Sequence, residues 1–212
     1  MSAPLTAAQM LQVLTAEGVA VVEIPGWQEH NRNHKGPFGS VNGLIIHHTG
    51  SDTADADTYA RTTLWNGFPS LPGPLCQAGG APDGRIYMVG NGRCNHAGGG
   101  DAAVLARVIP EDVPLDAELH PTKGNLDGID GNRHFYGLEI MYSGAHAMSP
   151  AQHDAAVKWS AAICRAHGWS ARSVIGHREW SKDKPDPGSI TMGQFRRDVQ
   201  ARLDATAAAH TG

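Results

Sequence analysis

The sequence lacks features that would place the protein in a membrane, in a secretory pathway or on nucleic acid. No run of about 18 apolar residues occurs, so no segment has the length of a membrane-spanning helix. The segment Met1–Leu5 has neither the positive charge nor the apolar stretch that begins a secretory signal, and we expect synthesis in the cytoplasm. A formal net charge of -4, with both signs interspersed, gives no basic stripe. We therefore expect no membrane and no nucleic acid as partners.

Cysteine is also scarce, and its spacing excludes common zinc-finger and redox motifs. The three cysteines, Cys76, Cys94 and Cys164, form no C-x-x-C pair, and their odd number leaves at least one thiol unpaired. We expect all three to be small buried residues, as free cysteines usually are. A disulfide between Cys76 and Cys94 is the alternative that the sequence leaves open.

Length and composition indicate one globular domain. The 212 residues suffice for one buried core, and no shift in composition divides them. We expect a core over residues 40–204, with residues 1–39 as an N-terminal extension of helix and loop packed on it and residues 205–212 as a frayed tail. No heptad pattern or large apolar stripe occurs, and we expect a monomer.

Alternating helix and strand signals predict an α/β or α+β fold with one central mixed sheet flanked by helices. Capping residues and apolar spacing predict helices that begin after Thr6, Asp55, Ser149 and Thr191. Apolar runs and one glycine-containing turn predict strands over residues 20–24, 44–47, 75–78, 85–89, 135–142 and 173–175. Residues 98–134 show no persistent period, which is typical of a long functional loop.

Two histidines and one aspartate stand where a metal site could form. His47 ends an apolar strand, His177 follows a short strand, and Asp186 comes nine residues after His177 in a Lys-Pro-Asp-Pro-Gly segment. Two imidazoles and one carboxylate leave a coordination position free, which distinguishes a catalytic zinc from a structural zinc with four protein ligands. His48 is the alternative to His47, since successive strand residues face opposite ways and only one of them can reach the ion.

Five motifs occur in the order in which a known family has them. They are Ile46-His47-His48-Thr49, Asp83-Gly84-Arg85-Ile86-Tyr87, Asn95-His96-Ala97-Gly98, Tyr136-Gly137-Leu138-Glu139, and Gly176-His177-Arg178-Glu179-Trp180 with Lys184-Pro185-Asp186-Pro187-Gly188. Over about residues 40–200 the chain resembles the zinc-dependent N-acetylmuramoyl-L-alanine amidases of the type 2 amidase and peptidoglycan recognition protein superfamily, which includes many phage endolysins. One such motif is weak evidence, whereas five in order are specific.

The resemblance implies a ligand set and a catalytic pair. The zinc ligands would be His47, His177 and Asp186. Glu139 falls where several members place the carboxylate that takes the proton of the attacking water, and Lys184 falls where they place a cation near the scissile carbonyl oxygen. The plainer alternatives are a carboxylate satisfied within the sheet for Glu139 and a solvated loop charge for Lys184.

The resemblance also implies roles for residues around the metal. His96 is expected to contact substrate near the ion, with an ordinary surface-loop histidine as the alternative. Glu179 could accept a hydrogen bond from the ring nitrogen of a ligating histidine that faces away from the metal, and Trp180 is expected to pack. Members of the family with a tyrosine on the first strand of the central hairpin use its hydroxyl near the metal, but Pro74-Leu75-Cys76-Gln77 has none.

The implied activity is hydrolysis of the amide between N-acetylmuramic acid and L-alanine, with bacterial peptidoglycan as the partner and Zn²⁺ as the cofactor. Without a secretory signal we expect a phage-type lysin, made in the host cytoplasm and released to the wall by a holin. A cytoplasmic wall-recycling amidase fits the same residues. A peptidoglycan-binding module without zinc and a zinc peptidase that cuts the stem peptide are the alternatives from other classes.

Overall fold

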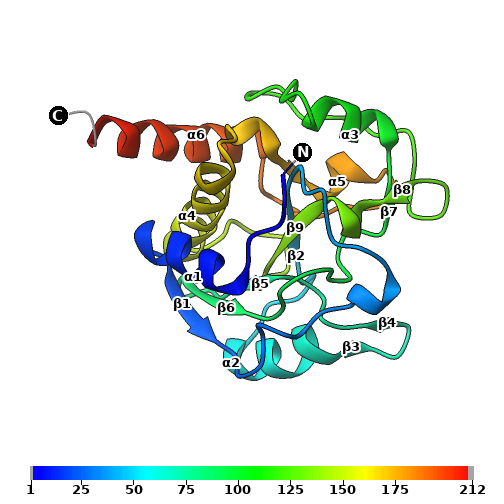
Figure 1. The fold of residues 1–212 in the computed structure, drawn as a ribbon, viewed down its shortest axis with the longest axis vertical. Coiled ribbons are helices and arrows are strands. Elements are labelled where there is room, and N and C mark those ends of the chain that lie inside the picture. Colours follow the sequence, from blue (N-terminus) through cyan, green and yellow to red (C-terminus); the bar gives the residue numbers. More distant parts are fainter. Residues whose placement is uncertain (1, 210–212) are drawn as a thin grey trace.

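A six-stranded mixed sheet lies at the centre of the computed structural model, which describes residues 2–209 (Figure 1). Its strands, in spatial order, are β1 (Ala20–Glu23), β6 (Arg85–Met88), β5 (Ala78–Gly80), β9 (Phe135–Ile140), β2 (Gly43–His48) and β10 (Val174–Gly176). The strands β5, β9, β2 and β10 are parallel to one another, whereas β6 is antiparallel to β5 and pairs in parallel with β1. The mixed sheet expected from the sequence is confirmed.

Helices cover both faces of this sheet (Figure 1). One face carries α1 (Ala7–Ala16), α4 (Pro150–His167) and α6 (Met192–Ala209), and the other carries α3 (Ala102–Val108), α5 (His177–Trp180) and α2 (Ala56–Tyr59) with its π-helical continuation Ala60–Leu64. Short 3-10 turns and two-stranded pairs complete the fold: Asn33–Lys35, Gly131–Arg133, Ala171–Ser173, β3 (Gly67–Phe68) with β4 (Leu71–Pro72), and β7 (Gly99–Gly100) with β8 (Ile129–Asp130). Among the described helices, none is long and apolar enough to cross a membrane.

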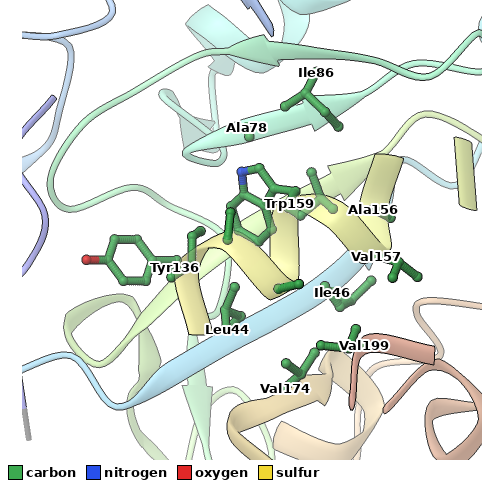
Figure 2. Packing of buried hydrophobic residues seen from close by; sticks show 14 of the residues in the cluster. Leu44, Ile46, Ala78, Ile86, Tyr136, Ala156, Val157, Trp159, Val174 and Val199 are labelled. Carbon is green, nitrogen blue, oxygen red and sulfur yellow. The ribbon is translucent and has the colours of Figure 1, made fainter. Parts of the chain in front are cut away.

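Alternation along β2 divides the core between the two faces. Leu44 and Ile46 lie on the side of α4, where Trp159 packs against the sheet (Figure 2). Ile45 points the other way and packs in a separate cluster with Trp180 of α5. Because side chains alternate along a strand, His47 emerges on the face of Ile45. The register of β2 therefore decides which histidine reaches the α3 and α5 side.

Side-chain caps set the ends of the predicted helices. The Thr6 hydroxyl accepts a hydrogen bond from the Gln9 backbone N–H at 3.3 Å, and the Gln9 side chain accepts from the Thr6 N–H at 2.9 Å. Ser149 caps α4 by accepting from the Gln152 N–H at 3.0 Å. Gly168 ends α4 with φ of 69°, in the left-handed region that glycine tolerates. The helices expected after Thr6 and Ser149 are confirmed.

The stretch 98–134 is more ordered than the sequence indicated. It contains α3 and the β7–β8 pair, and the buried Asp101 carboxylate joins the start of α3 to the backbone at Thr122 and Lys123. This carboxylate caps α3 at the Ala103 N–H (2.9 Å) and accepts from the Thr122 N–H (2.7 Å), the Thr122 hydroxyl (2.9 Å) and the Lys123 N–H (3.3 Å). The expectation of a stretch without secondary structure was wrong, because long-range hydrogen bonds to one side chain stabilise a helix too short to show a period.

The N-terminal segment is part of the sheet rather than only packed on it. Its strand β1 forms the sheet edge beside β6, and Met10 and Leu14 of α1 enter the main core. At the other end, α6 continues to Ala209, past the expected end of the core at residue 204. Residues 210–212 of the expected tail lie outside the described part of the chain.

The three cysteines are buried free thiols. Cys76, Cys94 and Cys164 form no disulfide in the structure, so the alternative pairing of Cys76 with Cys94 is not present. Burial raises the pKa of all three thiols. They behave as small core residues, as predicted.

A buried ion pair fixes the end of β10 to α6. The Arg196 guanidinium donates to both carboxylate oxygens of Glu179, at 2.8 and 3.0 Å, and both side chains are 0% exposed. The Glu179 carboxylate also accepts from the backbone N–H groups of Gly176 (2.9 Å) and Leu119 (2.8 Å), while Arg196 donates to the Val174 carbonyl (3.1 Å). Both side chains are fully buried, so removal of one of them leaves the charge of the other buried without its counter-ion.

We predict that Glu179→Ala lowers the free energy of unfolding by about 3–5 kcal/mol, as expected for half of a buried pair. Urea unfolding followed by circular dichroism measures it. Arg61→Ala is the control, because Arg61 pairs with Asp57 at 2.7 Å on an exposed helix surface and should cost less than about 1 kcal/mol. Similar small losses in both variants would contradict the prediction.

Candidate metal centre

The carboxyl ends of three parallel strands meet at one edge of the sheet. The register pairs Ile46 of β2 with Gly176 of β10, and His47 of β2 with Glu139 of β9. His177 follows Gly176 directly as the first residue of α5. Paired residues of neighbouring strands point to the same face, so His47 and Glu139 emerge on one side of the sheet. The chain thereby gathers residues 130 positions apart, His47 and His177, into hydrogen-bonding distance.

The three residues predicted as metal ligands form one buried cluster. Their exposed fractions are 1% for His47, 3% for His177 and 7% for Asp186. The Asp186 Oδ2 atom lies 3.0 Å from Nδ1 of His47 and 2.9 Å from Nδ1 of His177, and the two Nδ1 atoms are 2.9 Å apart. This cluster could hold a metal ion.

His48 takes no part in this cluster. Its ring lies edge-on to Tyr142, with centroids 5.9 Å apart, and close to Gly144, where an added Cβ would come within 2.3 Å of the imidazole. The side chain thus points to the face opposite His47, as alternation along β2 requires. The geometry favours His47 over His48 as the ligand.

Hydrogen bonds behind the cluster define which ring nitrogens carry hydrogen. Nε2 of His177 lies 3.1 Å from the Ala97 carbonyl oxygen, and Nε2 of His96 lies 3.1 Å from the Phe135 carbonyl oxygen. A carbonyl only accepts, so both of these nitrogens are donors. In neutral His96, Nδ1 is then an acceptor, and it takes the hydrogen of His47 Nε2 at 2.9 Å. These partners leave Nδ1 of both His47 and His177 without hydrogen, each with a lone pair directed at the other and at Asp186.

Burial disfavours the charged forms of His47 and His96. Burial, with a contribution from His177, lowers the pKa of His47 to about 4. Burial and the neighbouring His47 lower the pKa of His96 well below its usual value. At neutral pH His47 therefore offers an unprotonated imidazole, the form that binds metal.

Glu139 and Lys184 lie beside the cluster. Burial, with the negative charge of Asp186 adding to it, raises the pKa of Glu139 well above its usual value, and Lys184 partly opposes the shift. Within residues 2–209 no group donates a hydrogen bond to the Glu139 side chain, so the sheet does not satisfy this carboxylate. With the Asn125 amide oriented so that its oxygen accepts, Lys184 Nζ lies 3.2 Å from it. A carboxylate without other partners and with a raised pKa is suited to proton transfer.

Glu179 does not have the role that the sequence suggested. Nε2 of His177 bonds to the Ala97 carbonyl, whereas the Glu179 carboxylate accepts from the Gly176 N–H at 2.9 Å and pairs with Arg196. The expected hydrogen bond from histidine to Glu179 is therefore absent from the structure. A backbone carbonyl carries no sequence signature, so this partner could not be foreseen. Trp180, in contrast, is fully buried and packs as predicted.

His96 lies behind His47, and sequence reasoning missed the residues that hold it there. The side-chain oxygen of Asn132 accepts from the His96 N–H at 2.8 Å. The ring lies over Gly137, where an added Cβ would come within 2.6 Å of it. Both ring nitrogens bond within the protein, to His47 and to the Phe135 carbonyl, and substrate contact by His96 stays an untested prediction. Gly137, within the motif that contains Glu139, was the available signal of a close approach.

A tyrosine from another element lies near the strand segment that lacks one. Tyr59, the last residue of α2, is partly buried beside the start of the central hairpin. Burial, and then the neighbouring Glu139 and Cys76, raises the pKa of its phenol. This tyrosine thus comes from α2 rather than from the strand.

Comparison with known proteins agrees with this geometry. The family described as N-acetylmuramoyl-L-alanine amidase matches residues 37–189. Curated protein sequences give no significant match. Similar solved structures include the endolysin amidase LysCS from Clostridium intestinale URNW, with 15% identity, 87% of this chain and 95% of that chain covered, and a TM-score of 0.54. A mutant endolysin from Bacillus subtilis has 19% identity, coverage of 85% and 99%, and a TM-score of 0.55.

A peptidoglycan recognition protein from Drosophila, PGRP-SD, has 16% identity, coverage of 84% and 94%, and a TM-score of 0.50. At these identities the likenesses show a shared fold. The family match shows more than the fold, because it is a match in sequence over most of the chain. It includes the strands and the loop that bring His47, His177 and Asp186 together. On that match, the chain belongs to the N-acetylmuramoyl-L-alanine amidase family.

Proposed function

We propose that this amidase cleaves the bond between N-acetylmuramic acid and L-alanine of bacterial peptidoglycan with a zinc ion held by His47, His177 and Asp186. The convergence of two bare Nδ1 atoms and one carboxylate oxygen, each within 3.0 Å of the others, carries the proposal. Electron-rich atoms at these separations repel unless a proton or a metal cation lies among them. Two nitrogens and one oxygen suit zinc, and three protein ligands leave the fourth position of a catalytic site open.

The residues around the ligands supply the remaining chemistry. Zinc, when bound, contributes Lewis-acid activation of water and of the scissile carbonyl. Glu139, with its raised pKa, accepts the proton of the attacking water and then returns it to the leaving amine. The Lys184 ammonium, held by Asn125, stabilises the negative charge that develops on the carbonyl oxygen. The proton taken from water thus leaves with the product amine.

The cellular role that we propose is that of a phage-type lysin. Its support is the likeness in fold to endolysins from Clostridium intestinale and Bacillus subtilis. Such a protein is made in the bacterial host cytoplasm as a monomer and reaches the wall after holin-type release. A wall-recycling amidase would act on soluble fragments instead, so the form of the substrate separates the two roles.

The test of this function is digestion of purified peptidoglycan sacculi by the zinc-loaded protein, with a chelator-treated control and product analysis by mass spectrometry. We expect new L-alanine amino termini, intact glycan strands and loss of both products on chelation. Binding without new termini would indicate a recognition module, and new ends inside the stem peptide would indicate a peptidase. Cleavage of soluble muropeptides but not of sacculi would indicate a recycling amidase.

We predict that His47→Ala lowers zinc affinity by more than about 100-fold, beyond the 10–100-fold typical of residues that only support a ligand. His48→Ala is the matched control, because the neighbouring imidazole points to the other face of β2 and its loss should leave the affinity unchanged. Competition with a zinc chelator measures both variants. An equal loss in the two variants, or a loss confined to His48→Ala, would contradict the assignment.

We predict that Glu139→Gln lowers kcat by about 100- to 10,000-fold without loss of bound zinc, because the amide cannot accept the proton. The base works when deprotonated, so wild-type kcat should fall as pH drops through the raised pKa of Glu139, above its usual 4.5. The pH profile of the residual activity of Glu139→Gln should lack this acidic limb. Glu29→Gln, at an exposed carboxylate, is the control. An unchanged acidic limb in Glu139→Gln would assign the limb to another group.

A further inference from the structure

We infer that His96 is a positioning residue, which holds His47 in the tautomer and orientation whose Nδ1 lone pair faces the metal. The inference rests on the proposed function, because it concerns the same zinc site. It gives His96 a different task from the substrate contact that the sequence motif implied.

Two hydrogen bonds in series run from His47 through His96 to the Phe135 carbonyl. The Phe135 carbonyl accepts from Nε2 of His96 at 3.1 Å, and Nδ1 of His96 accepts from Nε2 of His47 at 2.9 Å. The carbonyl at the end of the chain has no hydrogen to give, which determines the direction of both bonds. Nδ1 of His47 therefore keeps its lone pair for the cluster, where Asp186 lies 3.0 Å away.

Burial and close contacts prevent rotation of the His96 ring. Its residue is 8% exposed, and its backbone N–H is bound to Asn132 at 2.8 Å. Gly137 lies so close beneath the ring that a Cβ there would meet its Cγ and Nδ1 at 2.6 Å. The rings of His96 and His47 meet edge-on at an interplanar angle of 83°. Packing and hydrogen bonds thus define a single orientation for the ring.

The two metal histidines are oriented from one short segment. His177 donates Nε2–H to the carbonyl of Ala97, the residue after His96. The Asn132 side chain accepts from both backbone N–H groups of this segment, each at 2.8 Å. Orientation of His177 therefore depends on the backbone, which a substitution at residue 96 leaves in place. Orientation of His47 depends on the His96 side chain, which a substitution can remove.

Two substitutions at residue 96 separate hydrogen bonding from packing. His96→Phe keeps an aromatic ring but leaves Nε2–H of His47 buried without an acceptor, and we expect zinc affinity to fall about 10–100-fold. His96→Asn places an amide oxygen near the position of the lost Nδ1, and we expect most of the affinity to return. His30→Phe is the matched control, because His30 also bonds to a backbone carbonyl, that of Val89 at 2.9 Å, and stacks on Trp65 away from the cluster.

Zinc affinity is measured by chelator competition on the full chain, with thermal unfolding of the metal-free proteins alongside. Support for the inference is a loss in His96→Phe, recovery in His96→Asn and wild-type affinity in His30→Phe at a comparable loss of metal-free stability. Wild-type affinity in His96→Phe, or an equal loss in His96→Asn, overturns it. If His96→Phe does not fold, nitrogen-15 NMR of wild-type His47 decides, since hydrogen on Nε2 supports the inference and hydrogen on Nδ1 overturns it.

Failure of the proposed function gives a different result. A wild-type protein that binds no zinc refutes the zinc site itself. The NMR spectrum of the metal-free wild type still reports the tautomer of His47, so the orienting role of His96 is tested independently of zinc.

Discussion

The parallel pairing of β2 with β9 and β10 is the constraint on which the site depends. It places His47 beside Glu139 and delivers His177 one residue past the end of β10. Strand side chains alternate, so a slip of one residue would turn His47 toward α4 and bring His48 to the cluster. Leu44 and Ile46 are buried on the side of α4 (Figure 2). The slip would turn these two side chains away from α4, so their burial opposes it. Apolar packing on one face thus specifies the chemistry on the other.

Burial then separates the tasks of the titratable groups in the site. The same loss of water that lowers the pKa of His47 raises the pKa of Glu139, since burial disfavours the charged form of each. Asp186 has a different environment, because its carboxylate oxygen lies within 3.0 Å of Nδ1 of both His47 and His177. Two carboxylates with different environments can thereby take different roles, one as a charged ligand and one as a proton acceptor.

Features that depend on neighbouring residue types could be predicted, whereas features that depend on contacts between residues far apart in the chain could not. The caps at Thr6 and Ser149 and the order of the motifs around the cluster indicated the helices and the candidate ligands, because each depends on neighbouring residue types. The helix α3 was missed because Asp101 binds Thr122, a contact 21 residues apart in the chain. The carbonyl partner of His177 was missed for a related reason, since any residue type can supply a carbonyl.

Charge balance at the site explains how the proposed parts work together. In the proposed site, Asp186 would cancel one of the two positive charges of a zinc ion, and the charges of ionised Glu139 and Lys184 would cancel each other. One positive charge would then be left in a region where His47, His177 and Asp186 are buried, and where a charge acts strongly. If Glu139 takes the proton of the attacking water, its negative charge is lost as the carbonyl oxygen gains one, so the net charge of the site would stay at one positive through the attack. A neutral third ligand would raise this net charge to two, so an aspartate ligand at position 186 would lower the charge that the buried site has to hold.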